Sequence, residues 1–202
     1  MEFDELLEKL NEERLYAEEN FVPIIRQQSA KFLYDFVKKN QCKRVLEIGT
    51  AIGYSGSIML SAGVENLVTI DINEKSLGVA KSTFKKLGYL ERVKIYHNDA
   101  KLVLKKLVEN QEKFDMIFLD GAKGQYVNYL PDLKLLLSPG SIIFADNVLL
   151  QGMVESTDKI PHRKRTMVVN LRRYLQEVSG KEFDTEIMRL EDGIAISYYK
   201  GE

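Results

Sequence analysis

Four residues in the second half of the chain have side chains suited to metal and acid–base chemistry. Asp120 ends the apolar segment FDMIFLD, and Lys123 follows three residues later; Asp146 and Asn147 end a second apolar segment, SIIFADN. Two carboxylates and an amide are oxygen ligands of the kind that Mg²⁺ prefers, and no His or Cys lies near them to favour zinc. Beside such a cation Lys123 would tend to be neutral, which suits a general base acting on a bound hydroxyl.

Each of these positions also has a simpler interpretation. Asp146-Asn147 can begin a turn after the strand, and Lys123 can be an ordinary solvated lysine of a loop. The convergence of three oxygen ligands at adjacent strand ends favours the metal site, because both apolar segments are expected to be neighbouring strands of one sheet.

A second group of residues lies in KRVLEIGTAIGYSGS, residues 43–57. Glu47 interrupts a short apolar run, and Gly49 and Gly53 bracket the loop that follows. A strand, a glycine loop and a helix form the start of a nucleotide-type βα unit. The spacing E-x-G-x-x-x-G differs from the G-x-G-x-x-G of dinucleotide sites. A carboxylate before the loop instead fits a ligand with a cationic amino-acid end, which indicates S-adenosylmethionine; a plain βα turn is the alternative.

Polar residues also follow the next two expected strands. Asp71 ends the second strand, where a carboxylate can accept hydrogen bonds from ribose hydroxyls. Asn98, Asp99 and Ala100 follow the third strand, where a short polar side chain can meet an adenine edge. Both aspartates have an alternative role as helix caps.

The elements that must position these residues alternate regularly. Strands are expected at 44–48, 66–72, 93–96, 114–119 and 141–145, with helices from 54, at 74–87, at 100–109 and at 125–137. Helical stretches before residue 40, including 24–39, precede them; a basic helix at 161–178 and a hairpin of strands 182–188 and 193–199 follow. This pattern predicts an α/β fold with a mostly parallel sheet, helices on both faces and an antiparallel pair at one edge.

Composition sets broad limits. The 202 residues suit one domain, 1–202, and 29 basic against 30 acidic residues favour no polyanion partner in bulk. Cys42 is the only cysteine, so no intrachain disulfide can form. The chain shows no signal-peptide pattern and no apolar run approaching the roughly 20 residues of a membrane span. We therefore expect a cytoplasmic protein without a membrane partner.

Four motifs, EIGTAIGYS, FLDGAKGQY, ADNVLLQG and EDGIAISYYK, together resemble those of the cation-dependent class I O-methyltransferases, which include the catechol and caffeoyl-CoA O-methyltransferases. Within that family the chain looks most like the bacterial tRNA 5-hydroxyuridine methyltransferases, through LYAEENFVPI and HRKRTMVVNLRRY. The resemblance implies a Rossmann-like class I methyltransferase fold with a seven-stranded sheet whose last strand is antiparallel. It also implies an N-terminal helical cap at 1–40 and a homodimer.

The resemblance assigns roles to individual residues. Asp120, Asp146 and Asn147 match the metal ligands, and Lys123 matches the catalytic lysine. Glu47, Gly49 and Ser55 match the contacts to the methionine end of the cofactor, and Asp71 matches the ribose contact. Asp99 and Ala100 match the adenine contacts. Val22 matches the segment that closes over the cofactor, and Asp120 also matches a residue beside it. One departure is Gly121, where relatives often have alanine; because a small residue is kept, no loss of function is expected.

The implied activity is an O-methyltransferase that uses S-adenosyl-L-methionine and Mg²⁺, or another divalent cation such as Mn²⁺ or Ca²⁺. The implied substrate is 5-hydroxyuridine at the wobble position in the tRNA anticodon loop, converted to 5-methoxyuridine. The candidate RNA-binding residues are Arg163, Lys164, Arg165, Arg172 and Arg173; a solvated helix face is their alternative reading.

Three other functions stay open. A catechol or caffeoyl-CoA type enzyme acting on a small-molecule hydroxyl substrate would use the same core. An NAD-dependent oxidoreductase has the wrong glycine spacing for this loop. A non-catalytic nucleoside-binding module leaves Asp120, Lys123, Asp146 and Asn147 without a purpose.

Overall fold

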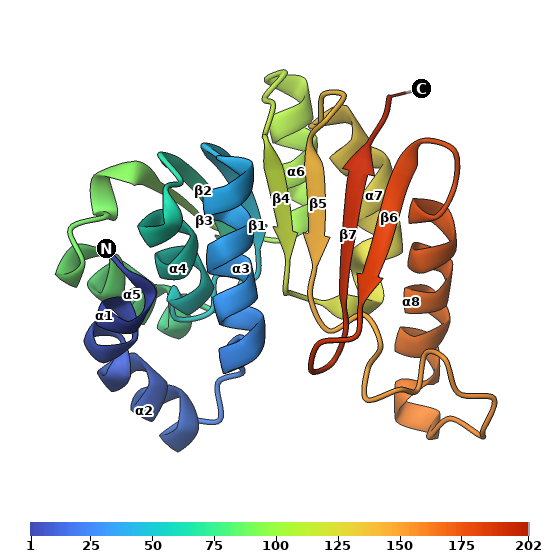
Figure 1. Ribbon diagram of the computed structural model, residues 1–202, viewed down its shortest axis with the longest axis horizontal. Coiled ribbons are helices and arrows are strands. Elements are labelled where there is room, and N and C mark those ends of the chain that lie inside the picture. Colours follow the sequence, from blue (N-terminus) through green and yellow to red (C-terminus); the bar gives the residue numbers. More distant parts are fainter. Residues whose placement is uncertain (202) are drawn as a thin grey trace. The chain divides into compact units, whose positions relative to one another are not determined.

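The computed structural model describes residues 1–201 and divides into two compact units, Met1–Val103 and Leu104–Glu202 (Figure 1). The single domain 1–202 stays a prediction, and residue 202 lies outside the described part. None of the described helices has both the length and the apolar composition needed to cross a lipid bilayer.

The first unit contains a small parallel sheet and most of the helices. Its β1, β2 and β3 pair in the order β3-β2-β1, all parallel. Helix α4 packs against α1, α3 and α5. The bounds are α1 (Phe3–Lys9), α2 (Asn11–Glu19), α3 (Gln27–Asn40), β1 (Arg44–Ile48), α4 (Tyr54–Ala62), β2 (Asn66–Asp71), α5 (Glu74–Lys86), a 3₁₀ turn (Leu90–Arg92) and β3 (Val93–His97), with α6 (Ala100–Glu109) beginning here.

The second unit contains four strands in the order β4-β5-β7-β6. Strand β7 runs antiparallel to both β5 and β6, whereas β4 and β5 are parallel. Helix α8 packs along β6 and against α7 (Figure 1). The bounds are β4 (Met116–Leu119), a 3₁₀ turn η2 (Lys123–Gln125), α7 (Tyr126–Leu135), β5 (Ile142–Ala145), a 3₁₀ turn η3 (His162–Lys164), α8 (Arg165–Val178), β6 (Phe183–Met188) and β7 (Ile194–Tyr199).

Strands β1, β4 and β5 arise where the sequence has short apolar runs. All residues of β4 and β5, and four of the five in β1, are buried, as expected for strands covered on both faces. The predicted antiparallel last strand is confirmed by β7.

Two helix starts were predicted too early. Helix α3 begins at Gln27, not at residue 24, because the chain is still extended at Arg26 (φ −72°, ψ 161°) and Ile25 is buried before the helix begins. The basic helix α8 begins at Arg165, since residues 162–164 form a 3₁₀ turn.

The turn between β6 and β7 packs tightly against the loop that follows β5. Gly193 has φ +82°, and a Cβ atom added to it would lie 2.3 Å from Cγ of Leu149. Leu149 is buried, and its Cβ would be only 2.9 Å away, so a rotamer change of the leucine cannot relieve the clash.

We expect Gly193→Ala to lower the free energy of unfolding by about 3 kcal/mol, through overpacking added to left-handed backbone strain. The measurement is urea denaturation. Gly152→Ala is the matched control, because Gly152 has φ +76° with no atom within 4 Å of the added Cβ; it should cost about 1 kcal/mol. Equal losses in the two variants would show that the contact with Leu149 is unimportant.

Candidate active site

Glu47 of β1 is fully buried and its carboxylate is completely enclosed by hydroxyl donors. Ser55, in the first turn of α4, donates to Oε1 at 2.6 Å, and Thr69 of β2 donates to Oε2 at 2.6 Å. Because the one Thr69 proton goes to Glu47, Thr50 donates in turn to Thr69, at 2.6 Å. A buried carboxylate is tolerated only with such partners. Sequence reasoning missed both threonines: Thr50 lies inside the motif EIGTAIGYS but was given no role, and Thr69 lies in no motif.

Small residues allow this carboxylate to approach α4. A Cβ atom on Gly56 would lie 2.9 Å from Cδ2 of Leu67, 3.0 Å from Cζ of Phe84 and 3.2 Å from Oε2 of Glu47. The backbone N–H of Gly49 donates to the Ile70 carbonyl at 2.9 Å, which ties the glycine loop to the end of β2. The glycine loop is therefore fixed by contacts with Glu47 of β1 and with the end of β2.

Asp71 links the end of β2 to the same loop. Its Oδ2 accepts the Ala51 N–H at 2.8 Å and its Oδ1 accepts the Asn73 N–H at 2.9 Å. The N-cap of α5 is Asn73, whose side chain accepts the Ser76 N–H, so the helix-cap alternative for Asp71 is wrong. A carboxylate has about four acceptor sites, which leaves capacity for ribose hydroxyls.

Asp99 does cap a helix. Its Oδ1 accepts the Lys101 N–H at 2.7 Å in the first turn of α6, so this alternative is confirmed, and its exposed side chain leaves the adenine role as a prediction. The neighbouring Ala100 is buried. Val22 is half-buried, with its N–H bonded to the Ala17 carbonyl at 2.9 Å.

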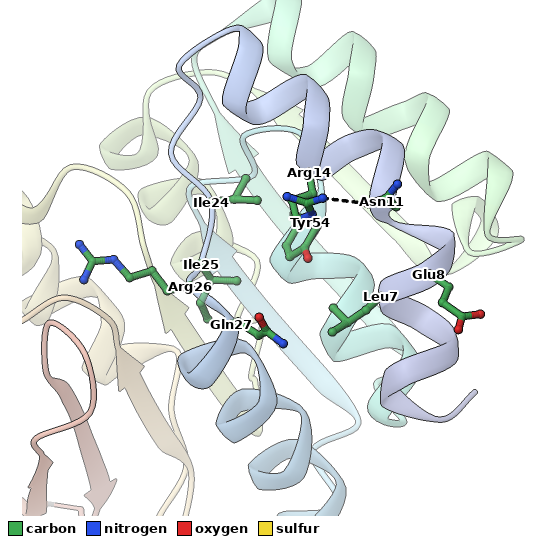
Figure 2. A pocket seen from close by; sticks show the side chains of 9 residues that line it. All are labelled: Leu7, Glu8, Asn11, Arg14, Ile24, Ile25, Arg26, Gln27 and Tyr54. Atoms are coloured by element: carbon green, nitrogen blue, oxygen red, sulfur yellow. Dashed lines mark hydrogen bonds between the residues drawn. The ribbon is translucent and has the colours of Figure 1, made fainter.

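A cavity of about 670 Å³ opens in the first unit, at a place that the sequence did not predict (Figure 2). Arg14 lies beside Tyr54. Burial raises the pKa of Tyr54, and the positive charge of Arg14 opposes part of this increase. The lining comprises Leu7, Glu8, Asn11, Arg14, Ile24, Ile25, Arg26, Gln27 and Tyr54. It includes none of the predicted cofactor contacts, although Tyr54 stands in the chain between Gly53 and Ser55.

In the second unit, the ends of β4 and β5 carry two carboxylates that perturb each other. Burial and the charge of Asp120 raise the pKa of Asp146 to about 7. Burial also raises the pKa of Asp120, opposed by Lys123, whose Nζ lies 3.4 Å from Oδ1 of Asp120. Two desolvated carboxylates that repel each other are an environment that a cation would stabilise.

The donor set of this cluster fits a hard divalent cation. Within residues 1–201, no three His, Cys, Asp or Glu side chains gather as metal ligands; the predicted third oxygen ligand is the Asn147 amide. Asn147 has φ +54°, a conformation that asparagine adopts more readily than most residues. The metal roles of Asp120, Asp146 and Asn147 remain predictions, supported by oxygen chemistry that suits Mg²⁺.

The loop after Asn147 is braced by the β6–β7 turn. Val148 N–H donates to the Gly193 carbonyl and Leu149 N–H to the Asp192 carbonyl, both at 3.0 Å. The Asp192 carboxylate also accepts the Gln151 N–H. Asp192 was not predicted as a site residue; the only sequence signal was its place in the EDG motif.

The basic residues near α8 have different roles. Arg172 donates to the carbonyls of Val154 (2.8 Å), Met153 (3.3 Å) and Ser156 (2.6 Å), so its guanidinium stabilises a loop. Lys164 bonds the Gln151 side chain at 3.3 Å, and Arg165 the Ile160 carbonyl at 3.2 Å. Within the described residues, Arg163 and Arg173 are exposed and make no hydrogen bond or ion pair.

Comparisons with known proteins agree with this arrangement. The family model described as O-methyltransferase matches residues 2–199. A catechol O-methyltransferase of Niastella koreensis is 37% identical over 127 residues, which cover 61% of this chain and 58% of that protein. Caffeoyl-CoA O-methyltransferase 2 of Zea mays is 32% identical over 139 residues, covering 66% of this chain and 53% of the relative. Each alignment thus spans less than two thirds of the relative.

A solved structure shares the fold over nearly the whole chain. The O-methyltransferase from Bacillus cereus, in complex with SAH, is 25% identical with a TM-score of 0.84, and the match covers 99% of this chain and 92% of that one. This likeness confirms the predicted Rossmann-like class I methyltransferase fold. On the family match across residues 2–199, the chain belongs to the O-methyltransferase family.

Proposed function

We propose that this protein is an S-adenosylmethionine- and divalent-cation-dependent O-methyltransferase of the catechol or caffeoyl-CoA type. The observation that carries the proposal is the pair of half-buried Asp120 and buried Asp146, with Lys123 beside Asp120 and Asn147 next to Asp146 in the chain. In a family of O-methyltransferases, this pair has the chemistry to hold a cation and an acceptor oxygen. A homodimer and a cytoplasmic location, expected from the sequence, belong to the same proposal.

The reaction is an in-line transfer of a methyl group. The bond between the sulfonium sulfur and the methyl carbon breaks as a bond from carbon to the acceptor oxygen forms, which leaves S-adenosylhomocysteine and a methyl ether. A bound divalent cation would lower the pKa of the acceptor hydroxyl. Asp120, Asp146 and Asn147 would hold that cation. Lys123, whose Nζ lies 3.4 Å from Oδ1 of Asp120, would take the hydroxyl proton or stabilise the oxyanion that its loss leaves.

The cofactor would bind at the strand ends of the first unit. Glu47, through Ser55, fixes the first turn of α4 beside the methionine end, and Asp71 holds the loop while accepting the ribose hydroxyls. These assignments rest on hydrogen bonds already present between the residues, which preorganise the loop before the ligand arrives.

We expect Asp71→Asn to weaken binding of S-adenosylhomocysteine about tenfold, because an amide nitrogen replaces one accepting oxygen and a charge-assisted hydrogen bond contributes about 1.5–3 kcal/mol. Isothermal titration calorimetry is the measurement. Glu74→Gln, an exposed change in the first turn of α5, is the control and should bind normally. Equal affinity in both variants would exclude a direct contact between Asp71 and the cofactor.

Divalent cations should stabilise the protein through the two aspartates. We expect saturating Mg²⁺ to raise the Tm of the wild type, because a ligand that binds only the native state stabilises it. Asp146→Asn should lose most of this increase, since a neutral amide replaces an anionic ligand. Glu186→Gln, a change at an exposed position of β6, should retain the increase in Tm. Differential scanning fluorimetry tests the effect without an activity assay; the same Mg²⁺ response in Asp146→Asn would contradict the assignment.

The specific substrate that we propose is 5-hydroxyuridine at the wobble position of tRNA. Its 5-hydroxyl and 4-carbonyl oxygens are adjacent, as the two oxygens of a catechol are, so the same chemistry serves both. The observation that favours RNA is the pair Arg163 and Arg173, exposed cations without a protein partner that are available to phosphates. A small-molecule catechol remains the second candidate, favoured by the named relatives.

Charge reversal at Arg163 and Arg173 separates these two substrates. The double change to glutamate should reduce kcat/KM for tRNA bearing 5-hydroxyuridine by about tenfold or more, because phosphate contacts dominate affinity, and should leave methylation of a free catechol unchanged. Arg172 is kept, because its side chain supports a loop. Lys75→Glu with Lys105→Glu, two exposed lysines, gives the same charge change as a control. Unchanged tRNA methylation in the Arg163/Arg173 variant would argue against RNA.

A further inference from the structure

A tyrosine hydroxyl joins the two ends of the segment that carries Asp120 and Lys123. This segment leaves β4 after Leu119, forms the 3₁₀ turn η2 and enters α7 at Tyr126. The Tyr126 hydroxyl reaches back and donates to the Leu119 carbonyl at 2.9 Å. Asp120 and Lys123 are thus enclosed in a loop whose two ends are joined by one side-chain hydrogen bond.

The same hydroxyl lies against the second strand end. Its oxygen is 3.4 Å from the Asp146 carbonyl, and the Asp146 N–H donates to the Leu119 carbonyl at 2.9 Å. The Leu119 carbonyl therefore accepts from both β5 and Tyr126. The Leu119 and Asp146 carbonyls both lie at this one phenol, which makes no hydrogen bond to the side chain of Asp120 or Asp146 within the described residues.

The phenol is held rigidly and keeps its proton. Tyr126 is completely buried, with its ring edge-on to Tyr174 at a centroid distance of 5.6 Å. Burial, and then the charges of Asp120 and Asp146, raise the pKa of Tyr126 well above its ordinary value. The raised pKa keeps the hydroxyl protonated, so it donates and the carbonyls at the strand ends accept.

We propose that Tyr126 is a positioning residue that sets the spacing of Asp120 and Asp146 for a divalent cation, acting through the carbonyls of Leu119 and Asp146. This inference rests on the proposed function. The carboxylates of Asp120 and Asp146 repel each other, so they would move apart if the backbone beside them were not fixed. A cation has to contact both of them within one coordination sphere. Groups that orient metal ligands from outside the coordination sphere typically change metal affinity 10- to 100-fold when removed.

Tyr174 provides a matched control. It is buried as completely as Tyr126 and packs against the same ring, and its hydroxyl, near Ser197, completes no hydrogen bond within the described residues. Tyr126→Phe and Tyr174→Phe each remove one oxygen from the same aromatic pair. Losing one hydrogen bond costs about 1 kcal/mol, against a total stability of about 5–15 kcal/mol, so both variants should fold.

The experiment measures the affinity of Mn²⁺ for the full-length, metal-free protein by calorimetry or by the electron paramagnetic resonance signal of free Mn²⁺. We expect Tyr126→Phe to bind Mn²⁺ at least about tenfold more weakly than the wild type, and Tyr174→Phe to bind it normally. In turnover, Tyr126→Phe should raise the Mg²⁺ concentration needed for half-maximal rate, while the KM for S-adenosylmethionine stays unchanged.

The outcomes separate this inference from the function on which it rests. If the wild type binds Mn²⁺ and Tyr126→Phe binds it equally well, the positioning role is wrong and the metal site survives. If both tyrosine variants lose affinity to the same extent, the effect is general packing and the positioning role is again wrong. If the wild type itself binds no Mn²⁺, cation dependence fails, and this inference fails with it.

Discussion

Each unit has to accommodate carboxylates that are removed from water at or near the ends of its strands. An unpaired buried charge is so costly that each must be provided with donors, a counter-charge or a ligand. Glu47 is provided with donors, because the hydroxyls of Ser55 and Thr69 bond its two oxygens and Thr50 bonds Thr69 in turn. Asp146 is not: one backbone N–H and a distant lysine compensate only part of its desolvation, and its pKa rises to about 7. The two carboxylates therefore differ in how far the protein itself compensates their burial.

The two kinds of site are preorganised by different means. Around Glu47 and Asp71, side-chain oxygens hold backbone and hydroxyl groups in place, so the loop is shaped before any ligand binds. Around Asp120 and Asp146, the carboxylates themselves are left available, and the backbone next to them is fixed instead, by Tyr126 on one side and the β6–β7 turn on the other. Rigid support of a first coordination shell is what metal sites require.

The strands and the polar residues at their ends could be predicted from the sequence, because apolar runs such as MIFL and IIFA have a single plausible environment. Supporting residues could not. Thr69 and Tyr126 act through distances that only the fold creates: Thr69 lies in no motif, and Tyr126 ends the motif FLDGAKGQY, which does not reveal its role. Arg172 shows the opposite limit: its charge suggested phosphate binding, whereas three carbonyls from a loop 16–19 residues earlier occupy it. The helix starts were missed because local sequence does not distinguish helix from the extended backbone at Arg26 or from the 3₁₀ turn His162–Lys164.

The bracing of the loop at Val148 and Leu149 by Asp192 and Gly193 also has a kinetic consequence. These amides can exchange their protons with solvent only when the turn between β6 and β7 detaches. Segments more than forty positions apart in the chain should therefore open as one cooperative unit. Local fluctuation at Asn147 is thereby tied to the stability of a hairpin that carries none of the proposed ligands, so a substitution that destabilises this hairpin should also loosen the backbone beside Asn147.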